Sequence, residues 1–485
     1  MSDAFELGSL LWRIVEELRK VLDIRPASEF ALALFFLKHV SDIEHNRAPG
    51  AAQRVVVPPS ASFGTILSDA DKPHNARRLE SALSELERAN KPLLESLSSD
   101  LKLNSATVRN SAGLDTALSY AIKIIAAAAP LSLPEKNQYQ AMSKAMDDFL
   151  KEHFAKDPIR PGEIYTPRAI ARMVAEVTMP QPGESVYDPA CGSGGMLLAA
   201  AEYLKSHSGN GEGGLEIFGQ EMESIPARLA QMNLVLHGVE AGRVVHGDTL
   251  HNPLLQESGA LRKFDIVVGN PPFSFADWGW EILKDDRFGR FKYGLPPKGR
   301  GDYAFILHMI ESMRPGTGRM AVIVPHGVLF RGGSEGEIRK NLIQGNLLDA
   351  VVGLPPKLFY NTAIPTAMMV FRRARATGAV IFVDASREYE VGRKLNSLRK
   401  EDVARIVKTC HERVTTAGYS RLVSHEDIAQ NDFNLNIPLY VTQAEPAVEA
   451  TDLAALADKE RALGLELAEI QREIELRLRE IGLRR

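Results

Sequence analysis

The pattern of hydrophobic and polar positions changes along the 485-residue chain. From about residue 5 to residue 155, apolar residues such as Leu11, Ile14 and Leu18 recur at intervals of three and four, which predicts amphipathic helices. From about residue 160 to residue 375, short apolar runs alternate with helical stretches, as in a parallel sheet covered by helices on both faces. The pattern therefore predicts a helical region followed by an α/β region.

One long helix is expected near the end of the printed sequence, from about residue 451 to residue 483. Its apolar residues recur mostly at intervals of three and four and form a narrow seam: Leu456, Leu463, Leu467, Ile470, Ile474, Leu478 and Ile481. Glu and Arg flank the seam, as in helices that pair with other helices, although packing on the helix's own domain is an alternative. We therefore predict four parts: a helical domain (1–155), an α/β domain (156–375), its C-terminal extension (376–450) and a helix for subunit docking (451–485).

The composition is ordinary for a soluble protein, with 45% hydrophobic and 25% charged residues. The two cysteines, Cys191 and Cys410, are far apart, which favours a reducing, cytoplasmic compartment. The first residues include acids and no apolar signal core, and no apolar stretch reaches the roughly 18 residues of a membrane span. No cluster of His, Cys and carboxylate residues has ligand spacing, so we predict no metal. The net charge of −4 is low for a chain that neutralises several phosphates by itself.

A glycine-rich turn follows the predicted strand that ends at Asp188. The sequence from Asp188 to Gly195 reads Asp-Pro-Ala-Cys-Gly-Ser-Gly-Gly, and a helix is expected to begin after it. Glycines let the backbone pass close to a ligand and adopt positive φ. The turn lacks the Lys-Ser/Thr pair of a phosphate-binding P-loop, and it does not match G-x-G-x-x-G, so neither a nucleoside triphosphate nor a dinucleotide is favoured.

Two further predicted strands end in acids, at Glu221 and at Asp248. A carboxylate in this position can accept hydrogen bonds from the two hydroxyls of a ribose. Ligands of open α/β sheets bind outside the carboxyl ends of the strands, so we expect both acids to line one crevice with the glycine turn. The alternative is that they are ordinary loop acids.

The strand pattern from Phe264 to Gly269 runs directly into Asn270, Pro271, Pro272 and Phe273. The two prolines fix φ and remove two N–H donors, which leaves the Pro271 carbonyl and the Asn270 amide free to accept hydrogen bonds from a ligand. The Phe273 ring supplies a flat apolar face beside these acceptors. This arrangement predicts a pocket for a planar group with an exocyclic amino group, and a simple turn is the alternative.

Together these motifs resemble those of S-adenosylmethionine-dependent amino-methyltransferases that act on DNA. The segment Gly162–Arg168 resembles the family segment that closes over the methionine end of the cofactor, and its place before the glycine turn is typical of one branch of adenine-N6 enzymes. The resemblance implies a Rossmann-like methyltransferase sheet, and it assigns these residues to S-adenosylmethionine: Glu163, Ile164, Tyr165, Thr166, Pro167, Arg168, Asp188, Ala190, Gly192, Ser193, Gly194, Gly195, Glu221 and Asp248. It assigns catalysis to Asn270, Pro271, Pro272 and Phe273.

The resemblance extends beyond the motifs to most of the chain. Leu10–Ile14 and Leu34–Asp42 resemble the helical domain of the modification subunits of type I restriction-modification systems, and Val383–Ser386 and Asn431–Pro438 resemble a later part of the same subunits. It implies a double-stranded DNA substrate and a separate specificity subunit that recognises the target. Two modification subunits per specificity subunit are implied, and a restriction motor and nuclease subunit is a further candidate partner. The stretch after residue 375 is short for a target-recognition domain, which also favours recognition by a partner.

Three other functions remain open. Methylation of cytosine N4 uses similar chemistry, but such enzymes more often have Ser at the first motif position, so Asn270 favours adenine. Related enzymes methylate glutamine amides of proteins or amino groups of RNA, but they tend to be shorter. An inactive scaffold is the non-enzymatic alternative, and the presence of all expected catalytic residues argues against it.

The proposed chemistry requires the adenine to leave the duplex and stack on Phe273, and it needs no dedicated general base, because the amine can lose its proton after attack. The loop from residue 274 to residue 301 interleaves aromatic residues such as Trp278 with basic residues such as Arg290. This combination favours contact with DNA, and an ordinary surface lid is the alternative.

Overall fold

The computed structural model divides the chain into two units, Met1–Val441 and Thr442–Arg485, which are described separately. The structure describes residues 2–45, 55–95, 97–98, 108, 112–127, 149, 166–207, 213–239, 241–359, 364–375, 378–393, 395–442 and 453–480. The predicted domain boundaries near residues 155, 375 and 450 remain predictions.

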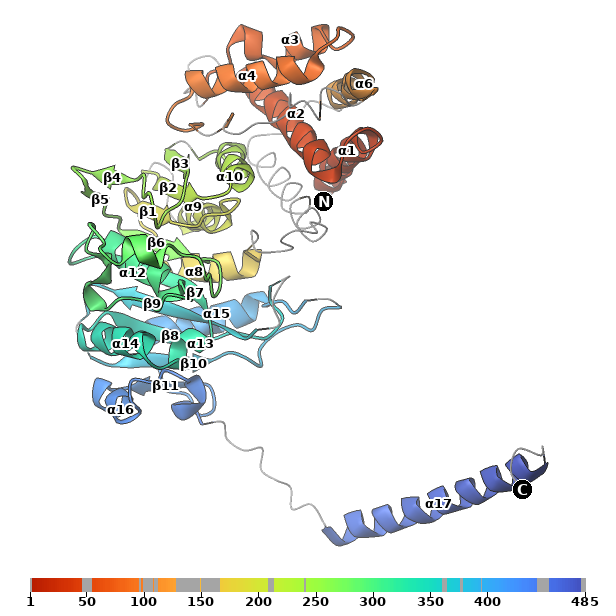
Figure 1. The fold of residues 1–485 in the computed structure, drawn as a ribbon, viewed down its shortest axis with the longest axis vertical. Coiled ribbons are helices and arrows are strands. Elements are labelled where there is room, and N and C mark those ends of the chain that lie inside the picture. Colours follow the sequence, from red (N-terminus) through yellow and green to blue (C-terminus); the bar gives the residue numbers. More distant parts are fainter. Residues whose placement is uncertain are drawn as a thin grey trace. The chain divides into compact units, whose positions relative to one another are not determined.

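The first part of the larger unit is helical in its described residues (Figure 1). Its helices are α1 (Ser2–Leu18), α2 (Ile24–His45), α3 (Phe63–Ser68), α4 (Asn75–Ala89) and α6 (Leu114–Ala127), with the short 3-10 turn η1 (Pro59–Ala61). The three-four pattern of α1 places Leu11, Ile14 and Leu18 in a core with Phe30 and Phe35 of α2. The prediction of amphipathic helices is therefore confirmed for these elements.

A nine-stranded sheet forms the centre of the second part, in the order β11-β10-β8-β9-β7-β6-β1-β2-β3 (Figure 1). The strands are β1 (Ser185–Asp188), β2 (Glu216–Glu221), β3 (Gly242–His246), β6 (Ile266–Gly269), β7 (Arg319–Pro325), β8 (Leu348–Gly353), β9 (Thr366–Arg372), β10 (Val380–Asp384) and β11 (Ser420–Val423). The five strands from β3 to β7 are mutually parallel. A separate hairpin pairs β4 (Gln256–Glu257) with β5 (Ala260–Leu261).

Helices cover both faces of this sheet. Successive side chains of β6 point to opposite faces and pack against helices on each. Ile266 and Val268 belong to one buried cluster with α8 (Arg168–Thr178), α9 (Gly195–His207) and α15 (Lys400–Glu412). Val267 belongs to a cluster on the other face with α12 (Asp302–Ser312) and α14 (Ser334–Gln344). Shorter elements are α11 (Trp280–Leu283), η2 (Arg290–Tyr293), α13 (Gly327–Phe330), α16 (His425–Gln430) and η3 (Ile437–Leu439). The prediction of an α/β fold with helices on both faces is confirmed.

One further helix connects the two regions of the larger unit. Helix α10 (Ser224–Leu236) contributes Ala230 to the core of the sheet and Leu229 to the core of the N-terminal helices. Arg228 of the same helix pairs with Glu29 of α2 at 3.2 Å, and both side chains are largely buried. The helical region is therefore packed on the outer part of the sheet domain through α10.

The sheet differs from the expected pattern in two ways. Strand β9 is antiparallel to both of its neighbours, β7 and β8. Strands β10 and β11 lie beyond residue 375 but continue the same sheet, β10 parallel to β8 and β11 antiparallel to β10. A buried strand has the same apolar run in either direction, so the sequence pattern alone did not distinguish these pairings.

The second unit contains the helix α17 (Leu453–Glu480), which confirms the predicted helix near the end of the sequence. Its seam residues Leu463, Leu467, Ile470 and Ile474 are exposed, whereas the side chains of Leu456, Leu478 and Ile481 lie outside the described set. Across the described ranges, no helix combines the length and the apolarity needed to cross a bilayer.

Candidate active site

The candidate site lies at the point in the sheet where successive strands stop being added on one side of β1 and begin to be added on the other. After β1 the chain adds β2 and then β3 on one side, and it returns to the other side of β1 to form β6. Strands β1 and β6 are parallel neighbours, with Val186 opposite Ile266 and Tyr187 opposite Val267. The loops after β1 and β6 therefore leave the same edge in opposite directions, and this is the place where open α/β sheets bind their ligands.

The glycine turn after β1 is held against β2 and α10. The N–H of Cys191 donates to the carbonyl of Gln220 (3.1 Å), and Asn233 Nδ2 donates to the carbonyl of Ser193 (2.8 Å). Gly194 has a φ of +83°, and a Cβ added there would lie 3.3 Å from the Cβ of Ala230. This conformation and this close approach require glycine in the turn that leads into α9.

Two acids flank the turn, Asp188, which is buried, and Glu221, which is partly exposed. Asp188 is only 2% exposed, and its Oδ1 accepts the N–H of Ala190 at 3.0 Å. Glu221 Oε2 accepts the N–H of Gly192, and its Oε1 accepts the N–H of Glu223, both at 2.9 Å. Burial, with a smaller contribution from the nearby Glu221, raises the pKa of Asp188 to about 8, and burial also raises the pKa of Glu221. Such a pair favours a ligand that brings positive charge and hydrogen-bond donors, and it disfavours a phosphate.

Asp248 follows β3 and is anchored by its own loop. Its Oδ1 accepts the N–H groups of Leu250 and His251, and its Oδ2 lies 2.8 Å from His251 Nδ1. A Cβ at Gly279, whose φ is +86°, would lie only 2.0 Å from His251 Nε2, so this glycine packs directly on the imidazole. No sequence motif indicated the contact between His251 and Asp248. Their spacing of three residues is the signal in the sequence that could have indicated it.

Asn270 follows β6 and carries a buried side-chain oxygen without a hydrogen-bond partner among the described residues. Its Nδ2 donates to Thr166 Oγ1 at 3.1 Å, whereas its Oδ1 is buried and has no hydrogen-bond partner in the described part of the chain. An unpaired buried acceptor costs about 1–3 kcal/mol, so it is expected where a ligand donor completes the bond. Pro271 beside it is buried, and the half-buried ring of Phe273 meets Phe359 edge-on, with ring centroids 6.1 Å apart. No motif or pattern in the sequence indicated Phe359.

The segment before α8 is described from Thr166 onwards. The Thr166 carbonyl lies 4.0 Å from the Cβ position of Gly195, so this residue contacts both the glycine turn and Asn270. Pro167 precedes the first turn of α8, and Arg168 pairs with Glu202 of α9 at 2.8 Å. The other predicted residues of this segment, Glu163, Ile164 and Tyr165, lie outside the described residues.

The segment from residue 274 to residue 301 is more ordered than expected, because it contains α11 and η2. Trp278 is fully buried, and its Nε1 donates to the carbonyl of Pro297 at 3.0 Å. Arg290 is 1% exposed and pairs with Asp286 at 2.7 Å. The expectation of DNA contact is therefore wrong for Trp278 and Arg290. Basic side chains that remain exposed in this segment are Lys284, Arg287, Lys292, Lys298 and Arg300.

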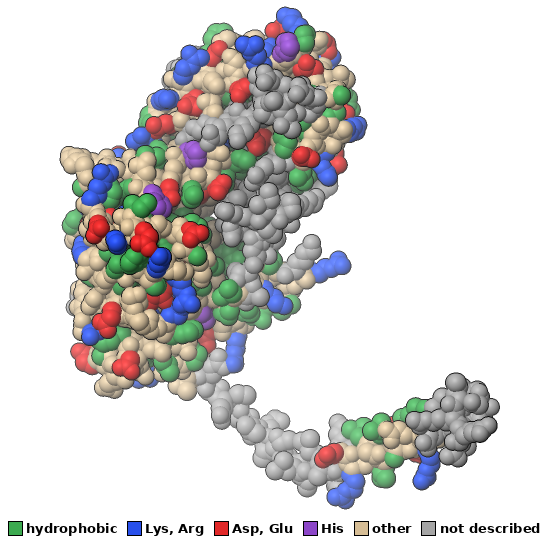
Figure 2. All heavy atoms as spheres, in the orientation of Figure 1, with side chains coloured by type: hydrophobic (Ala, Val, Ile, Leu, Met, Phe, Trp, Pro, Cys, Tyr) green, Lys and Arg blue, Asp and Glu red, His purple; other side chains and the backbone are tan. Residues whose placement is uncertain are grey.

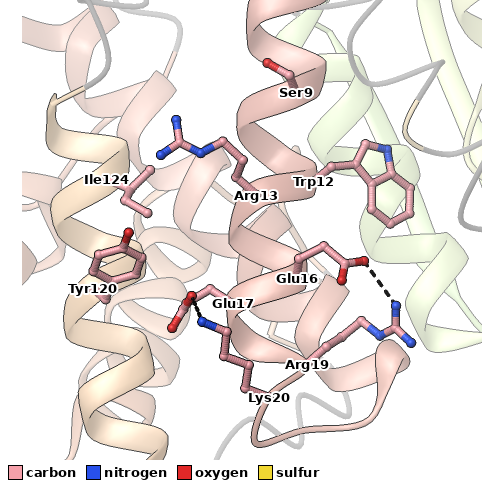
Figure 3. Close-up of a pocket in the computed structure, with 9 residues that line it drawn as sticks. All are labelled: Ser9, Trp12, Arg13, Glu16, Glu17, Arg19, Lys20, Tyr120 and Ile124. Atoms are coloured by element: carbon pink, nitrogen blue, oxygen red, sulfur yellow. Dashed lines mark hydrogen bonds and ion pairs between the residues drawn. The ribbon is translucent and has the colours of Figure 1, made fainter.

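A separate groove of about 740 Å³ lies between α1 and α6 (Figure 3). Two ion pairs at the C-terminal end of α1, Glu16 with Arg19 and Glu17 with Lys20, line part of it. Its lining residues are Ser9, Trp12, Arg13, Glu16, Glu17, Arg19, Lys20, Tyr120 and Ile124. All nine belong to α1, to the two residues just after it and to α6, so this groove is distinct from the candidate site at the sheet edge.

Comparison with known proteins identifies a family and several relatives of this chain. A model of the N-6 DNA methylase family matches residues 137–448. The MjaVII methylase subunit of a type I restriction enzyme from Methanocaldococcus jannaschii is 34% identical over 321 residues, which cover 63% of this chain and 54% of that protein. The HindI methylase subunit from Haemophilus influenzae is 33% identical over 343 residues, which cover 67% of this chain and 76% of that protein. The chain spans about half the length of several curated relatives that it matches.

A solved structure is similar over nearly its whole length. The type I restriction-modification system methyltransferase subunit from Streptococcus thermophilus is 27% identical to this chain, with a TM-score of 0.76. The similarity covers 90% of this chain and 99% of that one. The arrangement of helical region and sheet described above therefore occurs in a protein of known structure.

Proposed function

Because the chain belongs to the N-6 DNA methylase family, we propose that it is a site-specific DNA methyltransferase that transfers a methyl group from S-adenosylmethionine to N6 of adenine. The observation that carries this proposal is the buried Oδ1 of Asn270, which has no hydrogen-bond partner among the described residues. An adenine amino group is a planar N–H donor of the kind that this atom lacks. Phe273 supplies the stacking surface for the purine ring.

The residues at the sheet edge fit S-adenosylmethionine. When bound, this cofactor supplies an electrophilic methyl group on a positively charged sulfur. The buried carboxyl group of Asp188 and the neighbouring Glu221 suit that positive charge and the ribose hydroxyls. The glycine turn lets the backbone approach closely, and Asp248 lies in the loop that follows β3. The full set that we assign to the cofactor is residues 163–168, Asp188, Ala190, Gly192, Ser193, Gly194, Gly195, Glu221 and Asp248.

The titration of Asp188 provides a test of this cofactor site. Cofactor affinity is expected to rise by up to about tenfold per pH unit as the pH approaches 8, because a cationic ligand favours the ionised carboxylate and binding then releases a proton. In the free protein, the unfolding free energy is expected to fall as the pH rises from 3.8 to about 8, since the folded carboxyl group binds its proton more tightly than the unfolded one. Isothermal titration calorimetry in buffers of different ionisation enthalpy measures the released proton.

The matched variants are Asp188→Asn and Asp265→Asn. Asp188→Asn should bind the cofactor at least about tenfold more weakly near pH 8 and with a shallower pH dependence. Asp265 lies at the opposite end of the sheet, beside Arg314, and its replacement should leave the slope unchanged. An equally steep slope in Asp188→Asn would contradict the assignment of this carboxyl group.

The chain's own residues then orient the substrate. A paired adenine cannot reach the candidate site, so it must leave the duplex, at a cost of a few kcal/mol, and stacking on Phe273 offsets roughly 1–3 kcal/mol of that. Thr166 fixes the Asn270 amide by accepting its Nδ2–H, which directs Oδ1 towards the amino group. Asn270 Oδ1 and the Pro271 carbonyl each accept one N6–H. These bonds draw the nitrogen towards a tetrahedral geometry and direct its lone pair at the methyl group.

We infer that this chain works on double-stranded DNA together with other subunits. The similar curated proteins are named as methylase subunits of type I restriction enzymes, which supports a separate specificity subunit that reads the target. The net charge of −4, and the interspersed acidic and basic side chains on the face seen in Figure 2, support a partner that supplies much of the DNA affinity. Two copies of this chain per specificity subunit and an associated restriction subunit complete the proposed assembly. Both cysteines are free and buried, which supports a cytoplasmic location.

Single-molecule sequencing of host DNA tests the reaction and the base together. Cells with all partners and the wild-type chain should carry N6-methyladenine at one recognition sequence, and cells with Asn270→Ala should lack it. Loss of N4-methylcytosine instead would keep the fold and change the base. If wild-type and Asn270→Ala cells carried the same DNA modifications, the proposal would be overturned. The substrate would then be sought among amides or amines of proteins and RNA.

A further inference from the structure

The turn that follows Phe273 has an unusual backbone that is tied to another element. Ser274 has a φ of +52°, a left-handed conformation that costs a non-glycine residue roughly 1–2 kcal/mol. Its N–H donates to Asp302 Oδ1 at 2.8 Å. The N–H of Gly301 donates to the carbonyl of Phe275 at 2.8 Å. The chain leaving the Asn-Pro-Pro-Phe motif is thus fastened to the start of α12 on both sides of Ser274.

Asp302 is itself held by a cation, Arg331, whose side chain is only 16% exposed. Asp302 is 3% exposed, and its Oδ2 lies 3.0 Å from both terminal nitrogens of Arg331. Arg331 Nη1 also lies 3.1 Å from Glu335 Oε1, and its backbone carbonyl accepts a hydrogen bond from Arg339 at 2.7 Å. A Cβ at Gly327 would lie 2.5 Å from Arg331 Nε, so the guanidinium packs tightly on the backbone of α13. The cation is therefore fixed by packing as well as by charge.

This ion pair joins the ends of two neighbouring strands. Gly269 at the end of β6 is opposite Val322 of β7, and Arg331 follows the short helix α13 that begins two residues after β7 ends. The pair thus links the loop that carries Asn270 to the loop after the adjacent strand. An ion pair removed from water contributes little net stability relative to apolar packing, but it requires a precise arrangement of its charged groups.

We propose that Asp302 and Arg331 are positioning residues, which hold the turn at Ser274 so that the Asn270 amide and the Phe273 ring keep the geometry needed to receive the target base. The inference rests on the proposed function, because it assigns these residues to the same reaction. A misplacement of about 1 Å at such a site can lower the rate about a hundredfold. The pair acts on the rate of methyl transfer and not on cofactor affinity, since the proposed cofactor residues lie before α8 and after β1, β2 and β3, and none of those described bonds to Asp302 or Arg331.

The test compares three variants in the full complex with the specificity subunit, using unmethylated genomic DNA. Arg331→Gln breaks the pair, Arg331→Lys keeps the positive charge, and Glu184→Gln is the matched control. Glu184 forms a similar two-bond pair with Arg319 at 2.8 and 2.6 Å, but at the opposite end of β7. We expect Arg331→Gln to lower the single-turnover rate by about 10- to 100-fold, with cofactor affinity within about twofold of wild type. Arg331→Lys should recover part of the rate, and Glu184→Gln should match wild type.

Hydrogen exchange provides a readout that does not depend on activity. In Arg331→Gln the amides of residues 273–276 should exchange faster, while peptides from the N-terminal helices keep their protection. Ser274→Val is a second variant that leaves the ion pair intact, because Ser274 is exposed. A β-branched residue resists the left-handed conformation, so Ser274→Val should be slower in methyl transfer than Ser274→Gly.

The outcomes separate the two hypotheses. A folded Arg331→Gln protein with the wild-type rate would overturn the positioning role while the proposed function stands. Equal rates for Ser274→Val and Ser274→Gly would overturn it as well. A wild-type complex that methylates no DNA would overturn the proposed function, and unchanged exchange at residues 273–276 in Arg331→Gln would then overturn the positioning role too.

Discussion

Asn270→Ala is expected to lower the rate of methyl transfer by about a thousandfold while changing cofactor affinity by no more than about threefold. The substitution removes a buried acceptor at the sheet edge that has no hydrogen-bond partner among the described residues. The amino group would lose a hydrogen bond and also the group that orients its lone pair. Single-turnover methyl transfer measures the first quantity, and calorimetric titration with S-adenosylmethionine measures the second.

The thermal stability of the same variant separates a catalytic from a structural role. An unpaired buried acceptor destabilises the folded protein by about 1–3 kcal/mol, so its removal should leave the melting temperature unchanged or raise it. Thr166→Val provides a graded comparison, because it removes only the hydroxyl that holds Nδ2. We expect Thr166→Val to retain more activity than Asn270→Ala. A lower melting temperature with normal turnover in Asn270→Ala would show that the amide serves the fold.

The elements around the site could be predicted from the sequence because each strand there ends in a residue with a distinct role. The expected strands ending at Asp188, Glu221 and Gly269 are observed with those ends, as β1, β2 and β6, but β3 ends at His246, two residues before the end expected at Asp248. The expected α/β class and the resemblance to DNA amino-methyltransferases are both confirmed, the second by the family match. The order of strands and the reversed direction of β9 were not predictable, because they depend on pairing between distant segments and not on local pattern.

The contacts within the site were accessible only through the fold. Asn270 and Thr166 are 104 positions apart, and no periodicity connects them. The rule that ligands bind at the carboxyl ends of parallel strands brings the two loops together, but it does not indicate which atoms meet. Composition was misleading for Trp278, because an aromatic residue in a loop can be a buried anchor as readily as a stacking surface. The cofactor and catalytic roles of the individual residues stay predictions.

Charged substitutions in the seam of α17 are expected to abolish methylation by the assembled enzyme without affecting cofactor binding. Leu463, Leu467, Ile470 and Ile474 are 57%, 57%, 49% and 52% exposed, and their spacing of four, three and four residues places them on one face of the helix. An apolar face of this kind is typical of a helix that pairs with other helices. Leu467→Asp combined with Ile474→Asp would place two carboxylates in that interface, at a cost of several kcal/mol.

The control for the seam is Leu465→Asp. Leu465 is 71% exposed on the same helix, but it lies two residues from Leu463 and Leu467, on a different face. Light scattering of co-purified subunits measures assembly, and sequencing of host DNA measures methylation. Leu467→Asp with Ile474→Asp should lose both, and Leu465→Asp should keep both. If the double variant assembled and methylated normally, the specificity subunit would bind elsewhere. If it lost thermal stability as an isolated chain, the seam would instead pack on its own protein.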